Sequence, residues 1–138
     1  MTQMDDDNGC RLIGVVTVDF PYYIVCEFCE HGSVDYYLEP VNLPEHGKIL
    51  IACDIAKGMS HVNHVGFVHR DLAARNVLVD SALQSKVADF GLTRQVEEEE
   101  STYYRFKGGV VSVRWSAPEA FEDSNFSQFS DVWAFGMN

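Results

Sequence analysis

The residues best suited to chemistry lie in the octet His69-Arg70-Asp71-Leu72-Ala73-Ala74-Arg75-Asn76. The octet sets a cation beside a carboxylate, with an amide five positions after that carboxylate. The apolar run Val77–Val79 follows, and a polar loop flanked by apolar runs is typical of a loop held between packed elements, where catalytic groups are often carried. The octet alone could also be a surface turn, which is the less favoured of the two interpretations.

Three further blocks follow the octet in the chain. They are Asp89-Phe90-Gly91, Ala117-Pro118-Glu119 and Ser130-Asp131-Val132-Trp133. A protein that catalyses phosphoryl transfer mainly positions the reactants and neutralises their charge, and it needs to form few covalent bonds itself. Asp71 could accept the proton of an attacking hydroxyl, and Asn76 and Asp89 offer the hard oxygen ligands that Mg²⁺ prefers. Gly91 permits backbone angles that other residues resist, so its segment could swing.

The octet, Asp-Phe-Gly and Ala-Pro-Glu match the protein-kinase signatures in order and approximate spacing. The form Asp71-Leu72-Ala73-Ala74-Arg75-Asn76 resembles the tyrosine kinases, particularly the receptor type. The resemblance runs from about Leu12 to Gly136 and implies an α+β, bilobal kinase-like fold. A complete kinase domain is longer than 138 residues, so the resemblance implies a truncated one. Residues 11–28 would be strands of the small N-lobe, 29–33 the hinge, and 34–138 the mainly helical C-lobe through the start of the helix after Ala-Pro-Glu.

The resemblance also implies roles for single residues. Asp71, Arg75 and Asn76 would be catalytic, with Arg75 near the incoming phenol, and Asn76 and Asp89 would bind Mg²⁺. The ATP site would comprise Cys26 at the gatekeeper position, backbone groups of Glu27 and Cys29 at the hinge, Gly32, Leu78 under the base, and Asp89. Asp131 would hydrogen-bond the backbone of the catalytic loop.

Residues 89–119 would form an activation loop. Its Tyr103 and Tyr104 resemble the twin tyrosines of insulin-receptor-like kinases and would be phosphosites, with Arg70 as the acceptor for the phosphorylated loop. Such phosphorylation could occur in trans within a kinase–kinase dimer. Ser112 stands where tyrosine kinases usually carry proline, which bears on peptide docking.

Several expected parts have no counterpart. The chain shows no glycine-rich loop, no lysine on a third strand and no glutamate on the following helix; Lys48, Lys57, Lys86 and Lys107 all follow the hinge. We therefore predict a protein-tyrosine kinase that uses ATP and Mg²⁺ on protein substrates, with weak or no activity in the isolated chain. The alternative is a kinase-like binding or scaffold module. A serine/threonine kinase and a small-molecule phosphotransferase are disfavoured.

Composition narrows the function further. The formal net charge is −11, which argues against nucleic-acid binding because that needs a basic face. Cys26 and Cys29 form a C-x-x-C without a second pair at zinc-site spacing, so we expect core or near-core thiols. No apolar run approaches a membrane span. The expected location is the cytosolic side, in a parent that is either membrane-anchored or cytoplasmic.

Local patterns predict the elements that position these groups. Residues 1–9 are expected to be frayed, 12–18 and 22–28 to form a hairpin whose second strand is buried, and Ser33 to cap a helix through Leu38. A long helix is expected before Gly66, with Ile49, Ile55 and Met59 in the core. Short strands are expected over 77–79 and 86–88, a long loop over 91–116, a linker over 121–129, and a helix beginning at Ser130.

Overall fold

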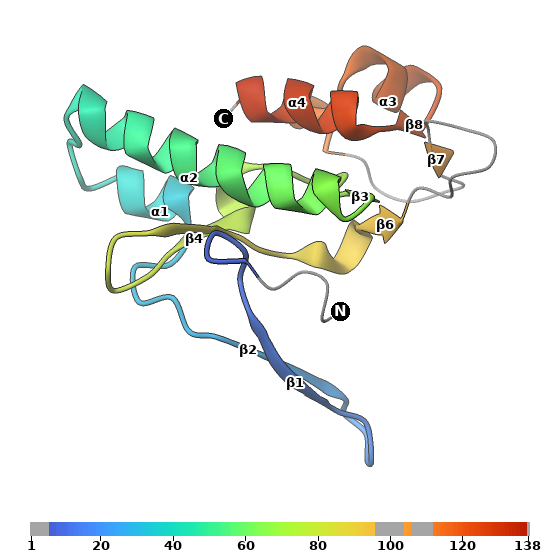
Figure 1. Cartoon of the computed structure of the whole chain (residues 1–138), viewed down its shortest axis with the longest axis horizontal. Helices are drawn as coiled ribbons and strands as arrows, with labels where there is room; N and C mark the ends of the chain where they lie inside the picture. Colours follow the sequence, from blue (N-terminus) through green and yellow to red (C-terminus); the bar gives the residue numbers. More distant parts are fainter. Residues whose placement is uncertain (1–5, 96–103, 106–111, 138) are drawn as a thin grey trace.

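The computed structural model describes residues 6–95, 104–105 and 112–137. The elements in chain order are β1 (Leu12–Val16), β2 (Tyr23–Cys26), α1 (Val34–Leu38), α2 (Glu45–His64), β3 (Phe67–Val68), η2 (Ala74–Asn76), β4 (Val77–Val79), β5 (Ser85–Val87), η3 (Phe90–Leu92), β6 (Arg94–Gln95), β7 (Tyr104–Arg105), η4 (Val113–Trp115), α3 (Pro118–Glu122), β8 (Asn125–Phe126) and α4 (Gln128–Gly136). The strands pair as antiparallel couples β1–β2, β3–β6, β4–β5 and β7–β8. Figure 1 shows the β1–β2 hairpin extending away from a body built around α2. No helix in the described ranges is long and apolar enough to cross a membrane.

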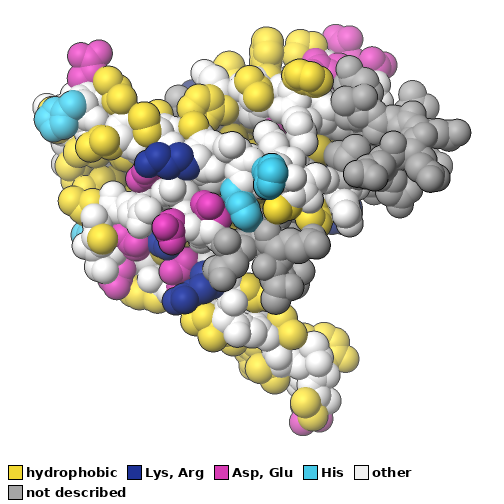
Figure 2. All heavy atoms as spheres, in the orientation of Figure 1, with side chains coloured by type: hydrophobic (Ala, Val, Ile, Leu, Met, Phe, Trp, Pro, Cys, Tyr) yellow, Lys and Arg dark blue, Asp and Glu magenta, His cyan; other side chains and the backbone are white. Residues whose placement is uncertain are grey.

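The β1–β2 hairpin was predicted correctly, but the burial of its second strand was not. Leu12 pairs with Cys26 and Val16 with Tyr23. Every residue of β2 is exposed, and Ile13 and Ile24 are 65% and 71% exposed. Figure 2 shows many apolar side chains exposed along this arm. A two-stranded ribbon buries neither face unless another layer packs on it, and none does so among the described residues.

The described part of the N-terminal segment is ordered, which contradicts the prediction that residues 1–9 are frayed; residues 1–5 lie outside the described ranges. The Asn8 carbonyl accepts from Val87 N–H at 2.7 Å, and Cys10 N–H donates to the Val87 carbonyl at 2.7 Å. These bonds satisfy the outer edge of β5, whose other edge pairs with β4. Gly58 of α2 permits this packing, because a Cβ there would lie 2.5 Å from the Asn8 carbonyl oxygen.

Helix α2 forms as predicted and ends before Gly66, whose φ of +78° suits glycine. Ile55 and Met59 are buried on it. The prediction that Ile49 belongs to the core was wrong, since it is 56% exposed. Ile49 precedes Ile55 by six residues, which at 3.6 residues per turn turns it about 120° away from the buried face.

The chain after Ala117 is more regular than predicted. The expected linker over 121–129 contains part of α3, all of β8 and the start of α4. Helix α4 begins at Gln128, two residues before the predicted start. Ser127 is its N-cap, and Ser127 and Ser130 each bond the other's backbone N–H in a capping box. Ser33 does occupy the N-cap position of α1, although its side chain bonds Asp35 and caps nothing.

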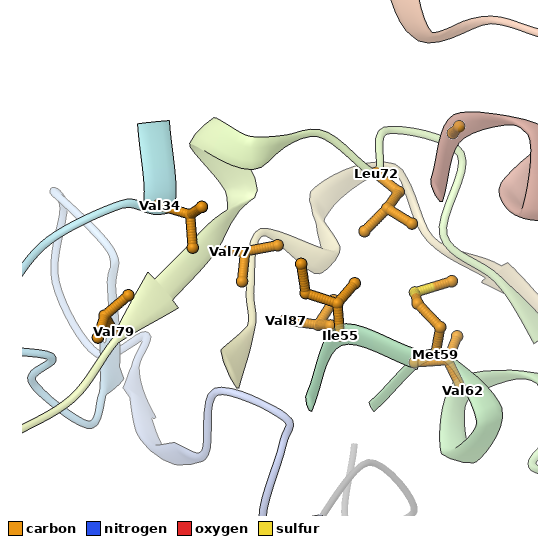
Figure 3. Close-up of a cluster of buried hydrophobic side chains, with 9 residues drawn as sticks. Val34, Ile55, Met59, Val62, Leu72, Val77, Val79 and Val87 are labelled. Carbon is orange, nitrogen blue, oxygen red and sulfur yellow. The ribbon is translucent and has the colours of Figure 1, made fainter. Parts of the chain in front are cut away.

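The hydrophobic core joins α2 to the β4–β5 hairpin and to the octet (Figure 3). Its buried members are Val34, Ile55, Met59, Val62, Leu72, Val77, Val79, Val87 and Ala134. Leu72 lies inside the octet and is 1% exposed. A second buried cluster contains Val68, Ala117, Ala120 and Phe126. The loop that carries the candidate catalytic groups is therefore anchored by burial of one of its own side chains.

Leu72→Ala is expected to lower the free energy of unfolding by about 2–5 kcal/mol, because it removes a buried side chain and leaves a cavity. The measurement is urea denaturation of this chain, and the matched control is Leu50→Ala. Leu50 is 62% exposed on α2, so its truncation is expected to change stability by less than about 0.5 kcal/mol. Equal effects of the two substitutions would contradict the anchoring role of Leu72.

Candidate active site

The octet is fixed to α4 by one buried carboxylate. Asp131, which is 3% exposed, accepts from His69 N–H at 2.8 Å and from Arg70 N–H at 3.0 Å. Arg70 has a φ of +74°, a left-handed conformation that is costly for arginine. Burial raises the pKa of Asp131, whereas the two N–H donors favour its ionised form. The predicted bond from Asp131 to the loop backbone is confirmed.

His69 is fully buried beneath the loop, and its hydrogen bonds define its tautomer. Nε2 faces the Ala88 carbonyl at 3.0 Å, and Nδ1 faces Asp71 N–H at 3.3 Å. Because a carbonyl only accepts and an N–H only donates, Nε2 carries the proton and Nδ1 does not. Burial lowers the pKa of His69, in agreement with a neutral ring. Its ring centroid lies 5.3 Å from that of Phe90, so it joins the octet to the Asp-Phe-Gly segment.

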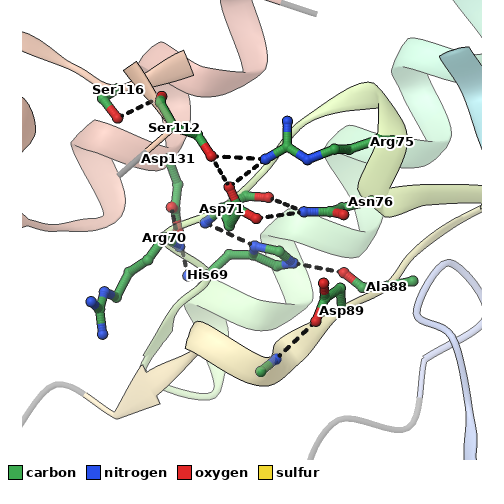
Figure 4. A network of polar contacts seen from close by, with 11 residues as sticks. His69, Arg70, Asp71, Arg75, Asn76, Ala88, Asp89, Ser112, Ser116 and Asp131 are labelled. Carbon is green, nitrogen blue, oxygen red and sulfur yellow. Dashed lines mark hydrogen bonds and ion pairs between the residues drawn. The ribbon is translucent and has the colours of Figure 1, made fainter. Parts of the chain in front are cut away.

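The Asp71 carboxylate is held on both oxygens (Figure 4). Arg75 Nη2 donates to Oδ1 at 2.7 Å, and Asn76 Nδ2 donates to Oδ2 at 2.9 Å and to the Asp71 carbonyl at 2.7 Å. Ser112 Oγ lies 2.8 Å from Oδ1. The Asp71 side chain keeps 15% of its surface exposed, so the structure brings the three predicted catalytic residues together around a carboxylate that solvent still reaches.

Asn76 and Asp89 lie at the same end of the β4–β5 hairpin. Asn76 directly precedes β4, Asp89 follows β5 after Ala88, and Ala88 N–H donates to the Asn76 carbonyl at 2.8 Å. The Asn76 amide gives both its hydrogens to Asp71, which leaves its side-chain oxygen for another partner. Asp89 is exposed. A carboxylate and an amide oxygen fit Mg²⁺, which commonly takes few protein ligands and completes its shell with water and phosphate. No cluster of three or more His, Cys, Asp or Glu side chains suited to a metal occurs in the ranges described.

The backbone freedom expected at Gly91 occurs at Asp89 instead. Asp89 has φ +57° and ψ +64°, and its Oδ1 accepts from Gly91 N–H at 3.4 Å. Glycine at position 91 matters for space, since a Cβ there would lie 3.1 Å from Asp89 Oδ1. A left-handed aspartate is uncommon but tolerated, because its short side chain can bond the local backbone.

The predicted hinge lies against β4. The Gly32 carbonyl accepts from Val79 N–H at 2.8 Å, His31 N–H donates to the Val79 carbonyl at 3.1 Å, and Ser33 bridges to Leu78. These contacts bring Gly32 and Leu78 together. Cys29 is buried, Glu27 and Leu78 are partly buried, and Cys26 is exposed at the end of β2.

The backbone groups without a backbone partner at the hinge include an acceptor and a donor. Glu27 N–H is used by the Arg11 carbonyl, and the Cys29 carbonyl accepts from Gly32 N–H. The Glu27 carbonyl and the Cys29 N–H have no backbone partner within the described residues. An acceptor and a donor two residues apart are what the edge of an adenine ring requires.

Lys86 is a structural residue that the sequence did not reveal. It is 9% exposed, and its Nζ lies 3.3 Å from Glu27 Oε1 and 3.1 Å from the Asp7 carbonyl. The Glu27 carboxylate also accepts from Arg11 N–H at 2.6 Å. The Glu27 side chain is thus committed to these partners, so only its backbone remains for a ligand. All three residues of β5 are buried, and nothing in the sequence around this strand names a partner for its lysine.

The cysteines are all free and differ in burial. Burial, followed by the neighbouring Cys29 and Cys26, raises the pKa of Cys10 to about 12. Burial also raises the pKa of Cys29. Cys26 is exposed, so the prediction of core or near-core thiols fails for it and holds for Cys29; Cys53 is also exposed.

The proposed regulatory residues are only partly described. Arg70 Nη1 donates to the Leu92 carbonyl at 3.1 Å, and its guanidinium lies 4.8 Å from the centre of the Phe126 ring. The Tyr104 backbone pairs with Phe126 in the β7–β8 couple. Tyr103 lies outside the described residues.

This site and fold are those of a protein kinase: a strand-rich part precedes a mainly helical part, and a held aspartate stands beside two candidate magnesium ligands. The chain belongs to the family described as protein tyrosine and serine/threonine kinase, whose profile matches residues 1–138. It is 42% identical over 139 residues to ephrin type-A receptor 5 of Gallus gallus, 45% identical over 139 residues to ephrin type-A receptor 8 of Homo sapiens, and 41% identical over 143 residues to ephrin type-A receptor 3 of Danio rerio. Each match covers 99% of this chain and 14% of the relative. The predicted resemblance to receptor-type tyrosine kinases and the α+β kinase-like fold are confirmed.

The buried neutral His69 is expected to make the stability of this chain fall in mild acid. Between its lowered pKa and its ordinary value of 6.5, the unfolded chain binds one more proton than the folded chain. The free energy of unfolding therefore decreases as the pH falls below 6.5, by at most about 1.4 kcal/mol per pH unit from this group.

Urea denaturation between about pH 7 and about pH 5.5 measures this effect. We expect a smaller loss of stability in His69→Gln than in the unchanged chain. His46→Gln, at an exposed position of α2, is the matched control and should keep the original pH dependence. An unaltered slope in His69→Gln would show that His69 does not stay neutral in the fold.

Proposed function

We propose that the protein containing this chain is a protein-tyrosine kinase that transfers the γ-phosphoryl group of ATP to tyrosine hydroxyls of protein substrates. The substrate oxygen forms a bond to the γ-phosphorus, the bond between that phosphorus and the bridging oxygen breaks, and ADP leaves. The proton of the hydroxyl passes to Asp71. The observation that carries the proposal is the Asp71 carboxylate, oriented by Arg75 and Asn76 and still reached by solvent.

Asp71 suits the role of proton acceptor because its position is over-determined. A carboxylate has about four acceptor sites, and three are filled by Arg75, Ser112 and Asn76. The remaining site, on Oδ2, is available to a substrate hydroxyl. Arg75 also packs over Trp115, with its guanidinium carbon 4.7 Å from the ring centre, which gives it a fixed place beside the incoming phenol.

Asn76 and Asp89 would hold Mg²⁺ through the Asn76 amide oxygen and the Asp89 carboxylate. The ion, when bound, would neutralise negative charge on the phosphates. The Glu27 carbonyl and Cys29 N–H would bind the adenine edge, with Leu78 under the base and Cys26 and Gly32 at its borders. The support for this assignment is the hinge backbone left unpaired and the contact of residues 31–33 with β4.

We also propose that residues 11–28 are strands of the small N-lobe, residues 29–33 the hinge and residues 34–138 the mainly helical C-lobe.

Regulation by phosphorylation of Tyr103 and Tyr104, in trans within a kinase–kinase dimer, is a further part of the proposal. Its support is that the Tyr104 backbone pairs with Phe126, on whose ring the Arg70 guanidinium stacks. Phosphate placed near that cation would gain a charge-assisted partner. The ephrin receptors among the relatives favour a membrane-anchored parent whose kinase portion faces the cytosol and takes part in signalling.

A kinase-like binding or scaffold module is the second candidate. No lysine of this chain lies in the sequence pattern of the strand whose lysine pairs with the phosphates. The buried Lys86 instead contacts the Glu27 carboxylate and the Asp7 carbonyl. These observations favour the second candidate. A charged clamp on the transferring group contributes several kilocalories per mole, so this chain by itself would bind nucleotide without efficient transfer.

Mg²⁺-ATP is expected to raise the melting temperature of this chain, and Asp89→Asn is expected to abolish most of the rise. At a nucleotide concentration about 100-fold above Kd, binding stabilises the fold by about 2.7 kcal/mol. Asp19→Asn, in the exposed hairpin turn, is the matched control and should behave as the unchanged chain. A shift that does not depend on Mg²⁺ or on Asp89 would contradict the proposed ligand set.

Asp71→Asn is expected to lower phosphoryl transfer to a tyrosine peptide by about 10²–10⁴-fold, because the amide cannot accept the proton. The measurement is transfer of labelled phosphate by the intact protein that carries this chain, with Asp19→Asn again as the control. Nucleotide binding without transfer in the unchanged protein would overturn the kinase proposal and support the scaffold.

A further inference from the structure

Ser112, which stands where tyrosine kinases usually carry proline, bonds two residues of the octet. Its hydroxyl lies 2.8 Å from Asp71 Oδ1 and 2.9 Å from Arg75 Nη2, while Arg75 Nη2 is itself 2.7 Å from Oδ1 (Figure 4). The three groups therefore form a closed triangle of hydrogen bonds. Proline, expected at this position, has no hydroxyl and could not take part.

The direction of each bond follows from the chemistry of the partners. A guanidinium only donates, so Ser112 Oγ accepts from Arg75. An ionised carboxylate only accepts, so the Ser112 hydroxyl gives its hydrogen to Asp71. Ser112 thus accepts a hydrogen bond from the Arg75 cation and donates one to the Asp71 carboxylate. Hydrogen bonds with a charged partner are stronger than those between neutral groups.

The hydroxyl is held in place by its own backbone. The Ser112 carbonyl accepts from Trp115 N–H at 3.0 Å and from the Ser116 hydroxyl at 2.8 Å. Trp115 in turn lies under the Arg75 guanidinium. Ser112 consequently joins the turn η4 to the octet through a side chain with little freedom.

We propose that Ser112 is a positioning residue that fixes the orientation of the Asp71 carboxylate and locks η4 onto the octet, an inference that rests on the proposed kinase function for its catalytic consequence. Ser112 and Arg75 occupy Oδ1, and Asn76 holds one site of Oδ2. The free site of Oδ2 is then directed toward the incoming hydroxyl. Loss of Ser112 Oγ would leave Oδ1 to Arg75 alone, which widens the range of carboxylate orientations, and would free η4 from the loop.

The catalytic consequence is tested in the intact protein that carries this chain. Ser112→Ala is expected to lower kcat about tenfold with KM values for ATP and peptide changed less than about twofold, because the lost bond aligns the base and not the substrate. Ser112→Thr, which keeps the hydroxyl, should restore kcat to within about threefold. Ser60→Ala, at an exposed position of α2, is the control. Equal kcat in Ser112→Ala and the unchanged protein would overturn the proposal.

The structural link is tested in this chain without catalysis. In a Trp133→Phe background, Trp115 is the remaining tryptophan, and its quenching by acrylamide reports the packing of η4. Ser112→Ala should raise the quenching constant roughly twofold, through local opening, and Ser112→Thr should leave it unchanged. Unchanged quenching in Ser112→Ala would show that Ser112 does not hold η4 onto the octet, and would overturn that part of the proposal. If the intact protein transfers no phosphate while the quenching result holds, the kinase function fails and the link stands.

Discussion

The buried Asp131 carboxylate, bonded to two consecutive backbone N–H groups, is the interaction on which the site depends. Those groups belong to His69 and Arg70, and the left-handed φ of Arg70 turns the second of them toward the carboxylate. Without Asp131, both donors would be buried or half-buried without a partner, at a cost of about 1–3 kcal/mol each. The strained turn persists because α4 supplies the acceptor. The direction in which the octet leaves this turn then determines where Asp71 lies.

The polar site and the hydrophobic core are two sides of the same loop. Leu72 points into the core cluster, while Asp71, next to it, points toward Arg75 and Ser112. His69 is buried on the core side and joins Asp71 N–H to the Ala88 carbonyl. Side chains in the core move little, so the buried Leu72 also restricts the position of the adjacent Asp71 carboxylate. A partly buried charge network benefits from this rigidity, because polar groups left without partners there destabilise the fold.

The elements that the sequence predicted are those specified by local pattern. Helix α2, the β4–β5 hairpin and the octet follow from periodicity, turn residues and motif spacing. The order of Asn8 and Gly9 was missed because it depends on pairing with Val87, which lies more than half the chain away. The exposure of β2 was missed because an apolar run does not say whether another layer covers it. Within the site, Asp71, Arg75 and Asn76 are neighbours in sequence, whereas the contact of Ser112 with Asp71 closes a loop of 41 residues.

The two halves of the proposed ATP site are held by different kinds of force. The octet is held by burial of Leu72 and His69 and by the hydrogen bonds to Asp131. The hinge is held by backbone bonds to β4 and by the Lys86–Glu27 pair, while the hairpin beyond it contributes no side chain to the core cluster. Both side chains of the Lys86–Glu27 pair are mostly buried, so salt screens this pair less than it would a pair on the surface. The hinge and the catalytic loop are thus both tied to the β4–β5 hairpin, the hinge by polar contacts and the catalytic loop mainly by apolar ones.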